Sequence, residues 1–361
     1  MAEASGAMCP APDPSPAVEA GRAPRVSIIV PCRNEKAHIE AALASMFGQV
    51  DVDGGVEIIV ADGCSDDGTR QILDRIAASK ARLRIIDNPQ RIVSTGLNRA
   101  IEAASGEVIV RMDTHSVYAS DYLACCLAAL ERSGAQNVGG PALTRAEGYF
   151  QQANALAYRS KFAVGGARFH DPDYEGDVDT VTYGCWRKQT LLALGLFDEA
   201  LVRNQDDELN LRLVRSGGRI WQTPAIRSWY FPRASIAGLW RQYEQYGYWK
   251  VAVIRKHRLP ASPRHLVPGL FVAALLVLMP LGFVSATARA TLGVLALAYL
   301  LANLGASVLT CREAPNRCYL PVMPFVFGAY HFGYGWGFLR GVLDFLVLKR
   351  GPASAWRELT R

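Results

Sequence analysis

Short apolar runs alternate with helical patterns in the first part of this 361-residue chain. The strand-like runs, rich in valine and isoleucine, are residues 26–30, 56–60, 82–88 and 107–113. The helical patterns between them are residues 36–47, 68–78 and 95–104. Continuous apolar strands that alternate with helices are typical of a parallel sheet covered by helices on both faces. We therefore expect an α/β fold built on a mostly parallel sheet.

Polar residues follow three of these strand-like runs. They are Arg33, Asn34 and Glu35 after the first run, Asp62 after the second, and Asp113 and His115 after the fourth. One interpretation of the last pair is an ordinary turn in which Asp113 only caps a helix. However, the carboxyl ends of parallel strands meet at one edge of a sheet, where such folds bind ligands. The position of all these clusters at one edge favours a binding site.

The residue types at this edge suit a nucleotide that carries a diphosphate. Asp62 could accept a hydrogen bond from a base N–H group or a ribose hydroxyl, even if its segment also begins a helix. Asp113 would repel two phosphates unless a divalent cation lay between them, and that cation would also stabilise a leaving diphosphate. Asp113 and His115 are therefore candidate metal ligands.

A second acidic cluster, Asp206, Asp207 and Glu208, begins an amphipathic helical pattern in residues 204–217. Helix capping is one interpretation, because the helix dipole favours negative charge at an N-terminus. A general base is the other, because a sugar hydroxyl is a poor nucleophile until a carboxylate accepts its proton. The residues of this stretch alone leave both interpretations open.

The C-terminal part of the chain predicts membrane segments. Residues 266–288 and 290–310 carry no charge, and each stretch is long enough to cross a bilayer as a helix. A third apolar segment, residues 318–340, contains two prolines and could span, re-enter or lie in the interface. Six basic residues and one acid precede the first span; they are Arg241, Lys250, Arg255, Lys256, Arg258 and Arg264, with Glu244.

This basic stretch predicts a cytoplasmic position for the residues before the spans, and contact with anionic lipid headgroups. We therefore interpret the net charge of +6 as a sign of membrane binding and not of nucleic-acid binding, since no nucleic-acid motif accompanies it. Residues 1–24 are rich in alanine and proline without a hydrophobic signal core, which predicts a disordered tail. The eight cysteines are scattered without a Cys-x-x-Cys pair, which favours reduced thiols.

Taken in order, five stretches resemble an inverting family 2 glycosyltransferase with the GT-A fold. They are "VSIIVPCRNE", "VEIIVADGCSDDGT", "GLNRAIEAASGEVIVRMD", "YGCWRKQTLLALGLFDE" and "QDDELNLRL", which lie within residues 25–232. Each stretch is weak alone, but the ordered set is specific. With Asp-Thr-His, "WRQYEQYGYWK" and the hydrophobic C-terminus, the chain is similar to the succinoglycan-type exopolysaccharide glucosyltransferases.

The resemblance implies a Rossmann-like sheet that binds a nucleotide-sugar, with a role for each matching position. The implied nucleotide-sugar site is Pro31, Arg33, Glu35, Asp62, Asn98, Arg99 and Asp113. Asp206 falls at the position of the family's catalytic base. The implied acceptor region is Gly184, Cys185, Trp186 and Asp207.

Two departures from the family pattern affect these implications. The family's Asp-x-Asp reads Asp-Thr-His here, so His115 replaces a carboxylate. Imidazole is a weaker ligand for Mg²⁺ than a carboxylate is, which leaves two alternatives: Mn²⁺ is preferred over Mg²⁺, or His115 contacts the phosphate directly. The Gln-x-x-Arg-Trp signature of processive synthases is missing from the sequence, where "QYEQYGYWK" occupies that region. This favours the addition of a single sugar.

The sequence therefore predicts a membrane-anchored enzyme of the cytoplasmic membrane. It would transfer glucose from a UDP-sugar to a polyprenyl-diphosphate-linked saccharide. The expected organisation is a transferase domain in residues 25–240, a basic juxtamembrane segment in 241–265, a membrane region in 266–348 and a tail in 349–361. The rivals are a transferase acting on bare polyprenyl phosphate, a sugar nucleotidyltransferase and a non-catalytic membrane assembly subunit.

Overall fold

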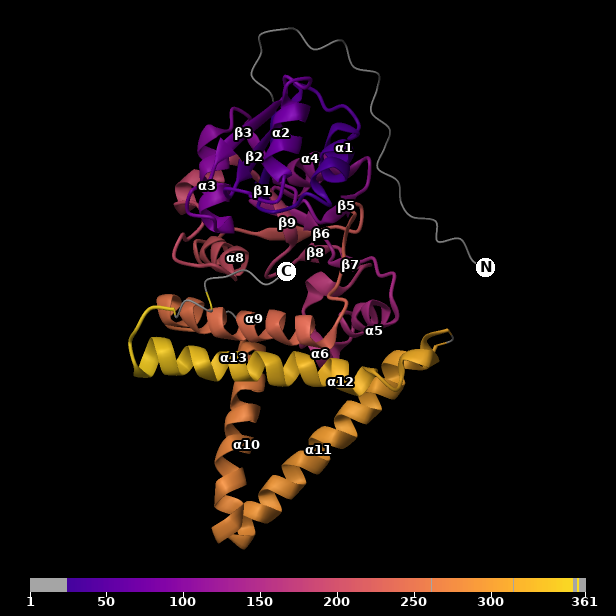
Figure 1. Ribbon diagram of the computed structural model, residues 1–361, viewed down its shortest axis with the longest axis vertical. Helices are drawn as coiled ribbons and strands as arrows, with labels where there is room; N and C mark the ends of the chain where they lie inside the picture. The colour runs from indigo at the N-terminus through magenta and orange to yellow at the C-terminus, as the bar shows by residue number, and fades with distance from the viewer. Residues whose placement is uncertain (1–24, 261, 314, 353–355, 357–361) are drawn as a thin grey trace. The chain divides into compact units, whose positions relative to one another are not determined.

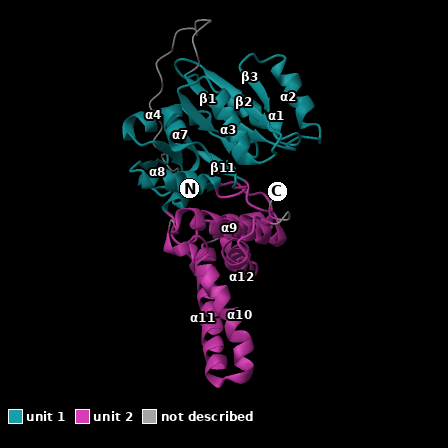
Figure 2. Cartoon of the chain, turned by 90° about the vertical axis from the view of Figure 1, so that its left-hand side faces the viewer, with its two compact units in different colours: residues 1–143, 168–200, 205–230 teal, residues 144–167, 201–204, 231–361 magenta. Residues whose placement is uncertain are grey.

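The structure is a computed structural model that describes residues 25–260, 262–313, 315–352 and 356 (Figure 1). The tail expected in residues 1–24, and residues 353–355 and 357–361 of the expected C-terminal tail, lie outside the described residues. The described chain divides into two compact units (Figure 2). The first contains residues up to 143 together with 168–200 and 205–230, and the second contains 144–167, 201–204 and 231 onward.

A sheet of eight strands, counted among the described residues, forms the centre of the first unit. In spatial order the strands are β3 (Leu83–Asp87), β2 (Val56–Asp62), β1 (Val26–Cys32), β4 (Val108–Arg111), β9 (Thr182–Arg187), β6 (Asn137–Gly140), β10 (Ile220–Gln222) and β8 (Gly176–Asp177). The first four strands are mutually parallel, and β9 runs antiparallel between β4 and β6. This mostly parallel sheet confirms the predicted α/β fold.

Helices cover both faces of this sheet because the strand side chains alternate between two apolar cores. Ile28 and Val30 pack into one core, with helices α1 (Ile39–Phe47), α2 (Thr69–Ala77) and α4 (Tyr122–Ser133). Ile29 packs into the other core, with α3 (Val93–Ala103), α7 (Lys188–Leu194) and α8 (Gln205–Arg215). The shorter elements are β5 (Ser116–Tyr118), β7 (Leu143–Thr144), η1 (Arg168–His170) and β11 (Ser228–Tyr230).

The second unit is helical among the residues described. Its elements are α5 (Tyr149–Ala157), α6 (Lys161–Val164), α9 (Ile236–His257), η2 (Pro263–His265), α10 (Val267–Val284), α11 (Ala286–Cys311), η3 (Asn316–Tyr319), α12 (Met323–Gly328), η4 (Ala329–Gly333), α13 (Tyr334–Gly341) and η5 (Val342–Val347). Two helices in the described chain are long and apolar enough to cross a membrane, Pro263–Val284 and Ala286–Cys311, with mean hydropathies of 2.4 and 2.0. They form a hairpin (Figure 1).

The third apolar segment predicted from the sequence runs beside α9 in the same direction. Glycines bring the two backbones into contact. A Cβ atom on Gly337 of α13 would lie 1.9 Å from the carbonyl oxygen of Glu244, and one on Gly247 of α9 would lie 2.0 Å from that of Tyr334. Close approach through small residues is a common way for apolar helices to pack. It ties this segment to α9 over several turns.

We expect Gly337→Ala to destabilise the second unit, because the new methyl group would force α9 and α13 apart. Overpacking of this kind costs about 1–3 kcal/mol. Gly293→Ala in α11 is the matched control, because a Cβ there meets nothing within 4 Å, and alanine is the better helix former. Thermal unfolding in detergent should show a lower midpoint for Gly337→Ala only. Equal midpoints for both variants would mean that the helices are not in backbone contact.

Candidate active site

The strand register places the predicted polar residues at one edge of the sheet. Cys32 at the end of β1 pairs with Asp62 of β2, and Asp62 pairs with Asp87 of β3. β4 ends at Arg111, and Asp113 follows two residues later. This edge is the carboxyl end of the parallel strands, as the sequence predicted.

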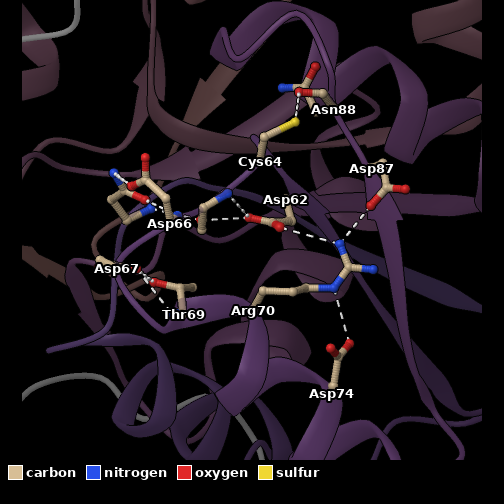
Figure 3. A network of polar contacts seen from close by, with 11 residues as sticks. Asp62, Cys64, Asp66, Asp67, Thr69, Arg70, Asp74, Asp87 and Asn88 are labelled. Carbon is tan, nitrogen blue, oxygen red and sulfur yellow. Dashed lines mark hydrogen bonds and ion pairs between the residues drawn. The ribbon is translucent and has the colours of Figure 1, made fainter.

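Asp62 lies inside a network of polar contacts at this edge (Figure 3). Its carboxylate accepts hydrogen bonds from the Ser65 hydroxyl at 2.6 Å and the Ser65 backbone N–H at 3.2 Å, and Arg70 Nη1 lies 3.4 Å away. The Arg70 guanidinium also contacts Asp87 at 2.6 Å and Asp74 at 3.1 Å. Asp62 is 1% exposed, so this network fixes its carboxylate in one orientation.

The loop after β1 is bonded to the loop after β2. The Asn34 backbone N–H donates to the Ser65 hydroxyl at 2.9 Å, and the Glu35 backbone N–H donates to the Thr69 hydroxyl at 2.8 Å. Pro31 pairs with Ala61 in the sheet, and the Arg33 side chain packs against Gly63. The structure thus brings Pro31, Arg33, Glu35 and Asp62 together at the candidate nucleotide site.

A buried arginine joins the two acidic clusters. Arg111 is 5% exposed, and its Nε and Nη2 atoms lie 2.7 and 2.9 Å from the two carboxylate oxygens of Asp113. Its Nη1 atom lies 2.5 Å from Oδ1 of Asp206. Residues 113 and 206 are therefore held by one guanidinium, although β4 and α8 are far apart in the sequence.

These contacts change the acid–base properties of the cluster. Burial alone would lower the pKa of Arg111, but the charges of Asp113 and Asp206 raise it, so the guanidinium stays protonated. Partial desolvation by the surrounding protein raises the pKa of Asp206, and the Arg111 charge opposes this shift without cancelling it. A carboxylate with a raised pKa is a stronger proton acceptor than an aspartate with the ordinary pKa.

The three acids at the start of α8 have different surroundings. Glu208 is 0% exposed and is bound by Arg212, whose Nε and Nη2 atoms lie 2.8 Å from its two oxygens. Asp206 contacts Arg111, and its side chain is 41% exposed. Asp207 is partly exposed and lies beside it. Asp206 is thus the acid of this helix start that shares the Arg111 guanidinium with Asp113.

Two tyrosines support the backbone near Asp113. The Asp113 N–H donates to the Tyr118 hydroxyl at 2.5 Å, and the Tyr183 hydroxyl bonds the Ser116 hydroxyl. Tyr183 has a φ of 63°, in the left-handed region that only glycine adopts readily. Burial raises the pKa of both phenols, so they remain protonated at neutral pH. Strain of this kind often accompanies functional sites.

The remaining predicted site residues, apart from the exposed Arg99, are hydrogen-bonded or packed within the protein. The Asn98 side chain exchanges hydrogen bonds of 2.9 Å with the Phe197 backbone, and Arg99 is exposed on α3. The side chains of Cys185 and Trp186 are buried in the two cores on opposite faces of β9. Gly184 has a φ of 103°, and a Cβ there would meet the Trp186 ring at 2.4 Å.

The side chains near Asp113 suit a divalent cation that would also be bound by the phosphates of a nucleotide. No three His, Cys, Asp or Glu side chains of the described chain are placed to hold a metal among themselves. Asp113 and the 50% exposed His115 could supply two ligands, and Glu35 lies 3.8 Å from His115 Nδ1. One guanidinium between two carboxylates leaves net negative charge at the site. Mg²⁺ and Mn²⁺ on nucleotides typically take their other ligands from phosphates and water.

The sheet edge thus combines the fixed carboxylate of Asp62 with Asp113 and with the acidic start of α8. The "Glycosyl transferase family 2" model matches residues 27–187. The succinoglycan biosynthesis protein ExoA of Rhizobium meliloti is 32% identical over 320 residues, 88% of this chain and 95% of that protein. The chain belongs to glycosyltransferase family 2. This confirms the predicted family and enzyme class, and it overrules the nucleotidyltransferase.

Two further similarities agree with this assignment. A Methanococcus voltae protein, dolichyl N-acetyl-alpha-D-glucosaminyl phosphate 3-beta-D-2,3-diacetamido-2,3-dideoxy-beta-D-glucuronosyltransferase, is 26% identical over 88% of this chain and 97% of its own length. Among solved structures, mannosyltransferase PcManGT from Pyrobaculum calidifontis, in complex with GDP-Man and Mn²⁺, has a TM-score of 0.55 and 23% identity over 89% of both chains. This likeness confirms the GT-A fold.

Proposed function

We propose that this glycosyltransferase transfers a single sugar, glucose, from a UDP-sugar to a polyprenyl-diphosphate-linked saccharide. The observation that carries the proposal is the contact of Asp206 and Asp113 with one buried guanidinium. In the proposed reaction, that contact sets the general base beside the donor-binding acid. The similarity to the succinoglycan biosynthesis protein ExoA supports a role in exopolysaccharide synthesis. The dolichyl-linked acceptor in the name of the M. voltae protein supports a lipid-linked acceptor.

We assign the steps of the reaction to these residues as follows. Asp62 and the loop after β1 would bind the base and ribose, and Asp113 and His115 would hold a divalent metal. Such a metal would supply positive charge to offset the negative charge that develops on the leaving UDP. Asp206 accepts the proton of the acceptor hydroxyl, whose oxygen attacks the anomeric carbon. The bond from that carbon to UDP breaks as the new one forms, and the configuration inverts.

The hairpin of α10 and α11 would anchor the enzyme in the cytoplasmic membrane. Most of its apolar surface is exposed, since only 17% and 11% of the two most apolar windows are buried. We propose that the segment from α12 to η5, which packs along α9, lies in the membrane interface and does not span the bilayer. Anchoring would raise the concentration of the lipid-linked acceptor at the enzyme.

Radiolabel transfer tests the proposal directly. Membranes that contain the protein are incubated with labelled UDP-glucose, UDP-galactose, UDP-N-acetylglucosamine or GDP-mannose and a lipid extract. We expect label from UDP-glucose in the lipid fraction, and mild acid should release it as an oligosaccharide. Release of a single labelled sugar would instead indicate bare polyprenyl phosphate as acceptor. Lack of lipid label from every donor would refute the proposal.

A further inference from the structure

Arg111 lies where sequence analysis predicts only an apolar strand. It is the last residue of β4, in register with Ile29 of β1. Side chains of a strand alternate between its faces, so Arg111 shares a face with Ile109, which packs in the core that contains α8. This placement directs the guanidinium to the helix that begins with Gln205 and Asp206.

The contacts of Arg111 use both edges of its guanidinium. One edge, Nε and Nη2, pairs with both oxygens of Asp113, and Nη1 reaches Oδ1 of Asp206. Bidentate pairs fix geometry as well as charge, because the donors of arginine lie in one plane. A contact to one Asp206 oxygen restricts rotation of that carboxylate and leaves the other oxygen for a substrate proton.

A purely structural ion pair would not need this arrangement. Burying an arginine is costly, and a single well-placed carboxylate is enough to neutralise it. Arg212 in α8 shows this simpler pattern, since it pairs with Glu208 alone and caps the backbone carbonyls of Leu194 and Leu196. Arg111 instead links two acids from different elements, and the proposed reaction uses both of them.

We propose that Arg111 is a positioning residue that fixes the base carboxylate of Asp206 relative to the donor-binding carboxylate of Asp113. This inference rests on the proposed function, because it assigns Arg111 a role through those two residues. The guanidinium acts through these two carboxylates, which it contacts directly. Its role is to keep the base aligned with the donor throughout the reaction.

A double-mutant cycle tests this role. Arg111→Lys keeps the charge but cannot bridge both acids, and we expect it to lower kcat at saturating donor by about 10- to 100-fold, as small misplacements do. In the Asp206→Asn background, where the base is already lost, the same change should lower kcat by no more than about twofold. Arg212→Lys is the control, and its kcat should match wild type even if its melting temperature falls.

The outcomes distinguish this inference from the proposed function. Equal losses from Arg111→Lys in both backgrounds would mean that Arg111 only maintains the fold, and would overturn the inference. Wild-type kcat in Arg111→Lys would overturn it as well. A wild-type protein that binds UDP but transfers no sugar to any lipid would refute the proposed function, and the inference with it. Thermal unfolding of each variant shows whether a loss of kcat reflects a loss of folded protein.

Discussion

Asp206→Asn is expected to lower the rate of sugar transfer by about 10²- to 10⁴-fold, the usual contribution of a general base. Asparagine keeps the shape of the side chain, and its amide oxygen can still accept the hydrogen bond from Arg111 that is present at 2.5 Å. UDP binding should therefore stay near the wild-type value. Transfer kinetics and UDP titration on the same preparation would separate the two effects.

Asp207→Asn is the matched control for that variant. Asp207 is the next residue of the same helix turn, so the substitution changes helix-end charge equally without removing the proposed base. We expect Asp207→Asn to keep kcat near the wild-type value; because Asp207 belongs to the implied acceptor region, a loss confined to the KM for the acceptor agrees with its place there. Normal transfer by Asp206→Asn together with an inactive Asp207→Asn would move the base assignment by one residue.

Asp113→Asn is expected to weaken UDP-sugar binding strongly, and excess EDTA should stop transfer by the wild-type enzyme. The substitution removes the negative charge that would hold the metal, and through the metal the diphosphate. It keeps one oxygen for Arg111, whereas Asp113→Ala would leave that buried arginine with Asp206 alone. Losing one partner of a buried ion pair typically costs about 3–5 kcal/mol, so the Ala variant would confuse binding with folding.

The metal assignment has its own readout. UDP titrations with and without Mn²⁺ should show that the metal strengthens binding to the wild type and much less to Asp113→Asn. His115→Ala should give an intermediate result if His115 is the second ligand. Full activity in excess EDTA would contradict the metal assignment and return the Asp113 segment to the interpretation of a simple turn.

The sequence was sufficient for the parallel part of the fold because each strand carries its own local pattern. Runs rich in valine and isoleucine predict β1 to β4. The polar residues that follow three of these runs predict the edge where Asp62 and Asp113 lie. The antiparallel place of β9 between β4 and β6 depends on long-range pairing that no local pattern encodes. Residue patterns alone could not place it there.

The role of Arg111 is not evident from the local pattern, because this residue lies within an otherwise apolar run. A charged residue inside a strand that is buried on both faces is itself a signal, since a buried arginine needs acidic partners. The sequence pattern also gives no sign that residues 144–167 group with the C-terminal helices. Ala153 and Ala157 of α5 pack against Met323 and Phe327 of α12, and only the tertiary structure reveals this core.

The structure of the lipid-linked product shows how many sugars the enzyme adds and with which anomeric configuration. The lipid-linked product made from UDP-glucose by the wild-type membranes would be isolated, and its mass and anomeric configuration determined by mass spectrometry and NMR. The account predicts a gain of one hexose in the β configuration from the α-linked donor, and no product with Asp206→Asn. A ladder of added sugars, or a product in the α configuration, would contradict a single inverting transfer at this site.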